Sequence, residues 1–100
     1  MGPIANRPQY EKVLGYLDKA KAEGATAACG GEAAGDLGGL FVKPTLFTGV
    51  KLDHTVVREE VFGPVMVVAR IAGIDEAIAT VNDSRFGLQT GVFTRDVQTA

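Results

Sequence analysis

Residues 59–69, which read EEVFGPVMVVA, decide how the rest of the chain is interpreted. Two acids, an aromatic residue and a Gly-Pro pair lead directly into residues 65–69, an uninterrupted apolar run. Such a run is typical of a strand that is buried on both faces in a parallel sheet. Ligands of open α/β sheets bind beside strand ends and in the loops there. The stretch therefore predicts a small-molecule site at the end of a buried strand.

The part of the chain before Gly30 predicts a helix followed by a short strand. From Tyr10, apolar residues follow at i+3, i+4 and i+7, which is the spacing of an amphipathic helix. Asn6 and Gln9 resemble a capping pair at its start, and Gly24 predicts its end in a left-handed cap. Residues 25–29 then form a short β-prone segment.

The segment between this strand and residue 59 predicts a loop, an irregular strand and a connector. Residues 30–39 contain five glycines, but their spacing matches no phosphate-binding motif, so we predict a plain surface loop. Residues 40–48 are rich in β-forming residues. Pro44 removes a ladder donor there, which predicts an edge or irregular strand. Residues 50–58 are a connector with room for one helical turn.

The chain after the apolar run predicts a helix and a further strand. Apolar residues recur at helical spacing over residues 74–82, with acids in the first turn, where the helix dipole favours them. Residues 91–94 predict a strand, so residues 64–95 form a strand, helix, strand unit with a right-handed crossover. Asp96 resembles the N-cap of a third helix. The predicted fold class is α/β, with a mostly parallel sheet and flanking helices.

Composition excludes several classes of protein. Hydrophobic residues make up 46% and charged residues 22%, which is ordinary for a soluble globular chain. The net charge of −2, without a basic cluster, argues against nucleic acid or an anionic membrane as partner. One cysteine and one histidine exclude an internal disulfide and a metal site of Cys/His type. With no membrane-spanning run and no signal-like N-terminus, we expect a cytoplasmic protein.

Three ordered motifs resemble the NAD(P)-dependent aldehyde dehydrogenases. Residues 59–64, EEVFGP, match the EE[IV]FGP signature of that family. Residues 41–47, FVKPTLF, look like its F-[IV]-x-P-T-[VL]-F segment. Residues 82–88, NDSRFGL, followed by GVFT at 91–94, look like its N-D-[ST]-x-[YF]-G-L and VFT segments. The resemblance spans nearly the whole chain.

The resemblance implies a function for the parent protein and roles for two residues. It implies oxidation of an aldehyde to a carboxylic acid with NAD or NADP as hydride acceptor. By the family pattern, Glu60 accepts hydrogen bonds from the hydroxyls of the nicotinamide ribose, and Phe62 packs beside the nicotinamide and ribose. From composition alone, residues 59 and 60 are a solvated acidic pair, and Phe62 is equally a core residue. Gly63 and Pro64 are expected to set the turn that aims both side chains.

The same resemblance implies that the chain carries no catalytic residue. The nucleophilic cysteine, the general base and the pyrophosphate turn of the family all precede the matched segment, so residues 1–100 are expected to be a single partial catalytic domain, truncated at both ends and inactive alone. Cys29 has no basic neighbour that could activate its thiol, so we expect it to be a buried or half-buried residue of the strand. His54 is expected to be a solvated loop residue.

Two further expectations concern the partners. The ligands implied are an aldehyde and a dinucleotide. Two helices cannot cover both faces of the predicted sheet, so we expect a homo-oligomer. The alternative is a stand-alone α/β binding or interaction module, which composition and periodicity permit equally well. Such a module would complete its third helix, whereas residues 96–100 supply about one turn.

Overall fold

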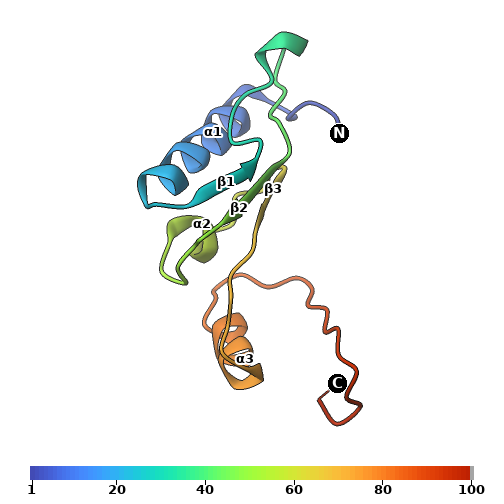
Figure 1. Cartoon of the computed structure of the whole chain (residues 1–100). Coiled ribbons are helices and arrows are strands. Elements are labelled where there is room, and N and C mark those ends of the chain that lie inside the picture. Colours follow the sequence, from blue (N-terminus) through green and yellow to red (C-terminus); the bar gives the residue numbers. More distant parts are fainter. Residues whose placement is uncertain (100) are drawn as a thin grey trace.

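The computed structural model describes residues 1–99 as a small three-stranded sheet with helices (Figure 1). The elements follow in the order α1 (Arg7–Ala22), β1 (Thr26–Cys29), the 3-10 helix η1 (Gly35–Leu37), β2 (Thr45–Thr48), α2 (Thr55–Arg58), β3 (Val65–Val67) and α3 (Ile74–Asn82). The molecule is elongated, with principal extents of 49 × 25 × 24 Å. One end holds α1, α2 and the sheet, and the other holds α3 and the segment that follows it (Figure 1).

The sheet is mixed, in the order β1-β2-β3. β1 pairs with β2 in antiparallel fashion, and β2 pairs with β3 in parallel, with Thr45 opposite Val65. The predicted α/β class is confirmed, and the sheet is mixed where a mostly parallel one was expected, because one of its two strand pairs is antiparallel. The prediction that residues 40–48 form an edge or irregular strand is wrong for β2, which is the central strand. Pro44 lies just before β2, whose first residue, Thr45, donates its backbone N–H to Pro64 O at 2.9 Å. The missing N–H of the proline therefore removes no hydrogen bond from the ladder.

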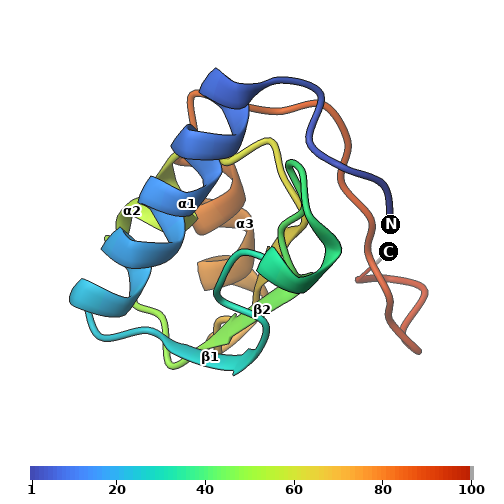
Figure 2. The same cartoon turned by 90° about the horizontal axis from the view of Figure 1, so that it is seen from above.

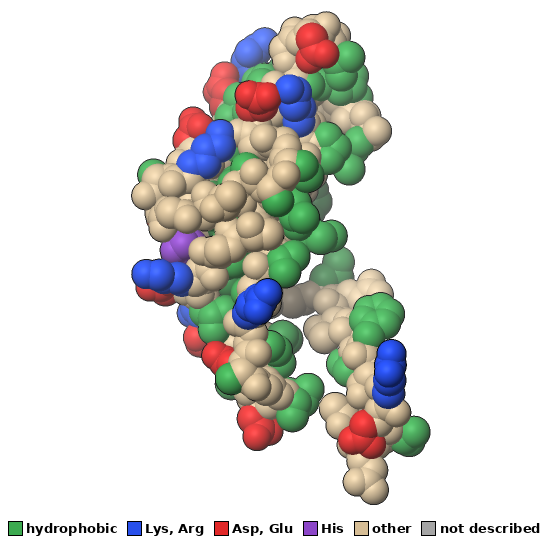
Figure 3. Space-filling view, viewed as in Figure 1, with side chains coloured by type: hydrophobic (Ala, Val, Ile, Leu, Met, Phe, Trp, Pro, Cys, Tyr) green, Lys and Arg blue, Asp and Glu red, His purple; other side chains and the backbone are tan. Residues whose placement is uncertain are grey.

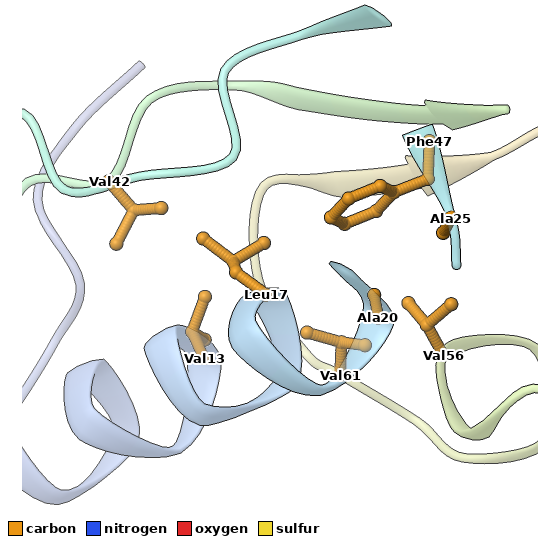
Figure 4. Packing of buried hydrophobic residues seen from close by; sticks show 8 residues of the cluster. All are labelled: Val13, Leu17, Ala20, Ala25, Val42, Phe47, Val56 and Val61. Atoms are coloured by element: carbon orange, nitrogen blue, oxygen red, sulfur yellow. The ribbon is translucent and has the colours of Figure 1, made fainter. Parts of the chain in front are cut away.

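The core lies between α1, α2 and one face of the sheet. Side chains of β2 alternate between buried and half-buried positions, which directs Thr45 and Phe47 toward the helices. α2 lies beside α1 on this side of the sheet (Figures 1 and 2). The buried hydrophobic cluster, shown in Figure 4, comprises Val13, Leu17, Ala20, Ala25, Val42, Phe47, Val56 and Val61.

The first helix forms where its end signals predict. The Asn6 side chain accepts a hydrogen bond from Gln9 N at 2.9 Å, which satisfies one free N–H at the start of α1. Gly24 has φ +97°, the left-handed conformation that ends a helix at little cost for glycine. The predicted capping pair and helix end are both confirmed. The predicted strand at 25–29 and the helical turn within 50–58 correspond to β1 and α2.

The apolar run is less buried than predicted. β3 spans only Val65–Val67, and Met66 is 65% exposed because its side chain lies on the uncovered face of the sheet. The prediction of a strand buried on both faces is therefore wrong for this chain. Residues 30–39 form the expected surface loop, apart from the short helix η1 and one bridge between Ala33 and Val42.

The last part of the chain is exposed. α3 has the predicted bounds, but its apolar residues remain open, with Ile78 53% exposed. The predicted strand at 91–94 is wrong: those residues are irregular, and Phe93 is fully exposed. The segment runs away from the sheet (Figure 1), so no neighbouring strand offers it a hydrogen-bonding ladder. The helix predicted from Asp96 does not begin within residues 96–99, where Asp96 instead caps a turn by accepting a hydrogen bond from Gln98 N at 3.1 Å.

Two absences hold for residues 1–99. None of the helices in that range is both long and apolar enough to cross a membrane. The same range contains no group of three or more His, Cys, Asp or Glu side chains that could hold a metal ion.

Candidate functional site

The candidate site is the loop of residues 59–64, which joins α2 to β3. α2 is the single turn that leads into this loop, and its start is bound to the end of α1. Both oxygens of the Glu23 carboxylate accept hydrogen bonds from Thr55, one from the backbone N at 2.8 Å and one from Oγ1 at 2.6 Å. These hydrogen bonds stabilise the ionised carboxylate and lower the pKa of Glu23 below its ordinary value. The loop therefore begins at a position set by α1.

Glu59 is occupied by a contact with α1. Tyr16 Oη donates to Glu59 Oε2 at 2.8 Å, and both groups are partly buried. This hydrogen bond to Glu59, helped by desolvation, raises the pKa of the Tyr16 hydroxyl. The interpretation of residues 59 and 60 as a solvated acidic pair is thus wrong for Glu59. Its carboxylate joins two elements that are 43 residues apart in the sequence.

Gln9 holds the middle of the loop. Its Nε2 donates to two successive backbone carbonyls, Val61 O at 3.2 Å and Phe62 O at 2.9 Å. The Val61 side chain points into the core and is only 9% exposed. Sequence reasoning assigned Gln9 only to the helix cap and gave no role to Tyr16. Their spacing with Val13, at i, i+4 and i+7 on one face of α1, is the signal that could have found them.

Phe62 is turned out of the protein. It is the only non-glycine residue among the described residues with a positive φ, +53°, and its side chain is 76% exposed. A positive φ is uncommon for a bulky residue and persists where the surroundings impose it. The next residue lies against α1, because a Cβ added at Gly63 would come 2.7 Å from Val13 Cγ2. The alternative that Phe62 is a core residue is therefore wrong for this chain.

Glu60 lies between these anchored residues and is exposed. Within residues 1–99 its carboxylate makes no hydrogen bond, so all of its acceptor capacity faces solvent. The structure thus brings a free carboxylate and an outward aromatic ring together on one short loop, whose other members are fixed. Their roles toward a cofactor stay a prediction.

A polar hollow of about 430 Å³ lies beside this loop, between α2 and the end of α3. Arg58 Nη1 and Asp83 Oδ2 form an ion pair across it at 2.6 Å. This pairing raises the pKa of Arg58 and lowers that of Asp83. The hollow therefore has its charges largely compensated by its own residues. Its lining consists of Arg58, Glu59, Asn82, Asp83, Ser84 and Arg85.

The burial of Cys29 and of His54 differs from what the sequence predicted. Cys29 is exposed at the end of β1, with Sγ 3.8 Å from Pro44 O, so the prediction of a buried or half-buried thiol is wrong. His54 is 7% exposed, and its Nδ1 has no partner among the described residues, so the prediction of a solvated histidine is also wrong. His54 is the N-cap of α2, and Val56 in that turn belongs to the core. Because the turn packs against the core, the neighbouring imidazole is buried as well. Neither residue lies in the 59–64 loop.

Comparison with known proteins relates the whole chain to one family. The model of the aldehyde dehydrogenase family matches residues 1–100. The betaine aldehyde dehydrogenase of Brucella anthropi is 54% identical over 100 residues, which cover 97% of this chain and 20% of that protein. That of Mesorhizobium japonicum is 50% identical over 103 residues, with 100% and 21% covered.

Solved structures agree with this relationship. The NAD⁺ complex of the aldehyde dehydrogenase from Bacillus cereus superposes with a TM-score of 0.92 at 48% identity, covering 99% of this chain and 20% of that one. The NAD-dependent aldehyde dehydrogenase from Sinorhizobium meliloti has a TM-score of 0.93 at 37% identity, covering 100% and 20%. The chain spans about a fifth of the length of these relatives. By sequence and by fold, the chain belongs to the aldehyde dehydrogenase family.

Proposed function

We propose that this chain is one part of a catalytic domain whose complete protein oxidises an aldehyde to a carboxylic acid, with a nicotinamide dinucleotide as hydride acceptor. In this proposal the 59–64 loop contacts the nicotinamide half of the cofactor. The observation that supports it most is the loop itself: Glu59 and Val61 are held by α1 and the core, whereas Glu60 and Phe62 face outward. A family signature with two free side chains on an anchored backbone is suited to ligand contact.

Each of these two side chains has a distinct task in this proposal. An ionised carboxylate accepts at both oxygens, so Glu60 suits the vicinal hydroxyls of a ribose. The flat ring of Phe62 gives the nicotinamide and its ribose an apolar surface that helps to orient the hydride acceptor. When bound, the cofactor supplies the hydride-accepting carbon. The nucleophilic thiol and the general base come from other parts of the complete protein.

The choice of cofactor and the setting of the protein belong to the same proposal. The solved relatives include NAD⁺ complexes, which favours NAD over NADP. The betaine aldehyde dehydrogenases among the relatives make betaine aldehyde the first substrate to assay. We further propose a cytoplasmic homo-oligomer. The open faces of the sheet and of α3 support the oligomer, because exposed apolar surface of this kind favours association.

A chimaeric enzyme tests the proposed activity. The matched part of the chain replaces the corresponding segment of the Brucella anthropi betaine aldehyde dehydrogenase, a substitution that 54% identity makes conservative. We expect NAD-dependent oxidation of betaine aldehyde by the chimaera and none by the 100-residue chain alone. A folded chimaera that reduces no NAD would contradict the proposal. Turnover by the isolated chain that survives Cys29→Ser would contradict it as well, since no thiol then remains.

The two outward side chains are tested in the same chimaera. Glu60→Gln leaves a poorer acceptor for two hydroxyls, and losing a charge-assisted hydrogen bond costs about 1.5 to 3 kcal/mol. We expect kcat/KM for NAD to fall by about 10- to 150-fold. Phe62→Ala is expected to lower it separately. Glu11→Gln on the exposed side of α1 is the matched control. Steady-state constants for Glu60→Gln equal to those of the control would remove Glu60 from the site.

A further inference from the structure

One face of α1 touches the candidate cofactor loop at three points. Gln9, Val13 and Tyr16 follow at i, i+4 and i+7, so they lie along one side of the helix. Tyr16 binds the Glu59 carboxylate, Val13 packs against Gly63, and Gln9 binds the carbonyls of residues 61 and 62. Of these contacts, only those of Gln9 are hydrogen bonds to the loop backbone, and they lie at the point where the chain turns outward.

The backbone conformation of Phe62 requires contacts from outside the loop to hold it. Phe62 has φ +53°, the left-handed conformation that a bulky non-glycine residue rarely adopts. Such a conformation persists only where contacts impose it. A glutamine amide has two donors, so one side chain can bind both the Val61 and the Phe62 carbonyl. These two hydrogen bonds fix the two peptide planes that flank Phe62, which points away from the core, whereas Val61 before it points into the core.

We propose that Gln9 is a positioning residue for the cofactor: by binding these two carbonyls, it holds the turn that keeps Phe62, and with it Glu60, directed outward. The inference rests on the proposed function of the 59–64 loop. Gln9 acts through the loop backbone, so its loss displaces the ring and the carboxylate together. A displacement of about 1 Å is enough to weaken a preorganised site strongly.

The enzymatic test compares two substitutions on α1 in the chimaera. Gln9→Met keeps the length of the side chain and removes both donors, while the Gln9 backbone N that pairs with Asn6 is unaffected. Glu11→Met changes an exposed residue of the same helix and is the control. We expect Gln9→Met to raise the KM for NAD by about 10-fold, the loss expected for two neutral hydrogen bonds. The KM for betaine aldehyde should stay as in the control.

A double-mutant cycle separates positioning from a general structural role. If Gln9 acts through the loop, Phe62→Ala removes the part of the Gln9→Met effect that the ring carries, and the two effects together are smaller than their sum. A purely structural role predicts additive effects on kcat/KM for NAD. Additive effects, or a KM for NAD no higher than that of Glu11→Met, would overturn the inference.

A measurement on the 100-residue chain keeps this inference distinct from the proposed function. Amide nitrogen relaxation reports the order of Phe62 and Gly63 without any cofactor. We expect rigid values, with an order parameter of about 0.85, in the unmodified chain, and values below about 0.6 in Gln9→Met. Unchanged order in Gln9→Met would refute the positioning role even if the chimaera is active. A loop that loosens as expected, in a chimaera that oxidises no aldehyde, would instead refute the proposed function alone.

Discussion

At the scale of single residues, the candidate site depends on a close approach of the loop to α1. Gly63 needs no unusual φ, but a Cβ at this position would lie 2.7 Å from Val13 Cγ2 and 3.2 Å from Val13 Cγ1. Real Cβ atoms do not approach another carbon so closely, and Val13 is completely buried, so it has little room to move. Glycine is therefore required here by space.

This close approach predicts the cost of adding one methyl group. We expect Gly63→Ala to lower the free energy of unfolding by about 1 to 3 kcal/mol, the usual penalty for overpacking. Val13→Ala makes room for that methyl group, so the double variant should lose less than the sum of the single losses. Gly87→Ala, where the added Cβ meets nothing within 4 Å, is the control. Urea titration of the four chains measures the coupling, and strictly additive losses would contradict it.

At the scale of elements, the loop between β1 and β2 contains glycines that are needed for two different reasons, backbone conformation and lack of space. Gly30 has φ +67°, and a Cβ added there would lie 2.2 Å from Pro44 O. Gly38 has a similar φ of +65° with open space around it, and Gly35 has neither constraint. The three positions therefore separate backbone strain from steric overlap within one loop.

A series of alanine substitutions tests this separation. We expect Gly35→Ala to change the free energy of unfolding by less than about 1 kcal/mol. Gly38→Ala should cost about 1 to 2 kcal/mol, because alanine resists a positive φ. Gly30→Ala should cost more than about 3 kcal/mol, because β1 and the residues before β2 must also move apart. Equal losses for Gly30→Ala and Gly38→Ala in urea titrations would show that the overlap with Pro44 adds nothing to the loss of unfolding free energy.

The start of α2 predicts a dependence on pH. The folded state lowers the pKa of Glu23 from its ordinary value of 4.5, chiefly through the hydrogen bond from the Thr55 hydroxyl. A lowered folded pKa means that this stabilisation is present above pH 4.5 and is lost as the pH falls through the folded value. Glu23→Gln should therefore lower the urea midpoint at about pH 7, with a difference that shrinks toward about pH 2.5. A difference of equal size at both values, measured against Glu11→Gln, would contradict the assignment.

At the scale of the whole molecule, hydrophobic side chains remain open on the sheet and on α3. Met66 in the edge strand β3 and Val68 just after it are 65% and 49% exposed, and Ile78 and Val81 of α3 are each 53% exposed. Figure 3 shows hydrophobic side chains gathered over the sheet and again over the C-terminal part. Apolar surface next to an unpaired strand edge favours association between chains.

We therefore expect the 100-residue chain to form a dimer or a larger assembly. Sedimentation over a range of concentrations should show association that Met66→Lys and Ile78→Lys weaken, since each places a charge on the exposed surface. Leu37→Lys alters a residue that is similarly exposed, at 63%, but lies in η1, outside the sheet and α3, and should have no effect. A compact monomer that binds no hydrophobic dye at any concentration would contradict this expectation.

Much of the local structure could be predicted because its causes lie within a few residues. Asn6 and Gln9 specify the start of α1, Gly24 specifies its end, and the spacing of apolar residues specifies α3. A helix cap or a left-handed turn depends on the chemistry of its own residues, so it can be predicted from the local sequence. The motif at 59–64 likewise identifies the family without any knowledge of the fold.

The sequence by itself thus determined α1 and α3, the α/β class, the family and the loop on which a cofactor site is proposed. Only the tertiary structure decided that β2 is central, that Met66 is open, that His54 is buried while Cys29 is exposed, and that Gln9 reaches Phe62. The physical reason is distance along the chain. Burial and side-chain pairing depend on which remote segment lies opposite, as for Gln9 and Phe62, which are 53 residues apart. No local pattern specifies that neighbour.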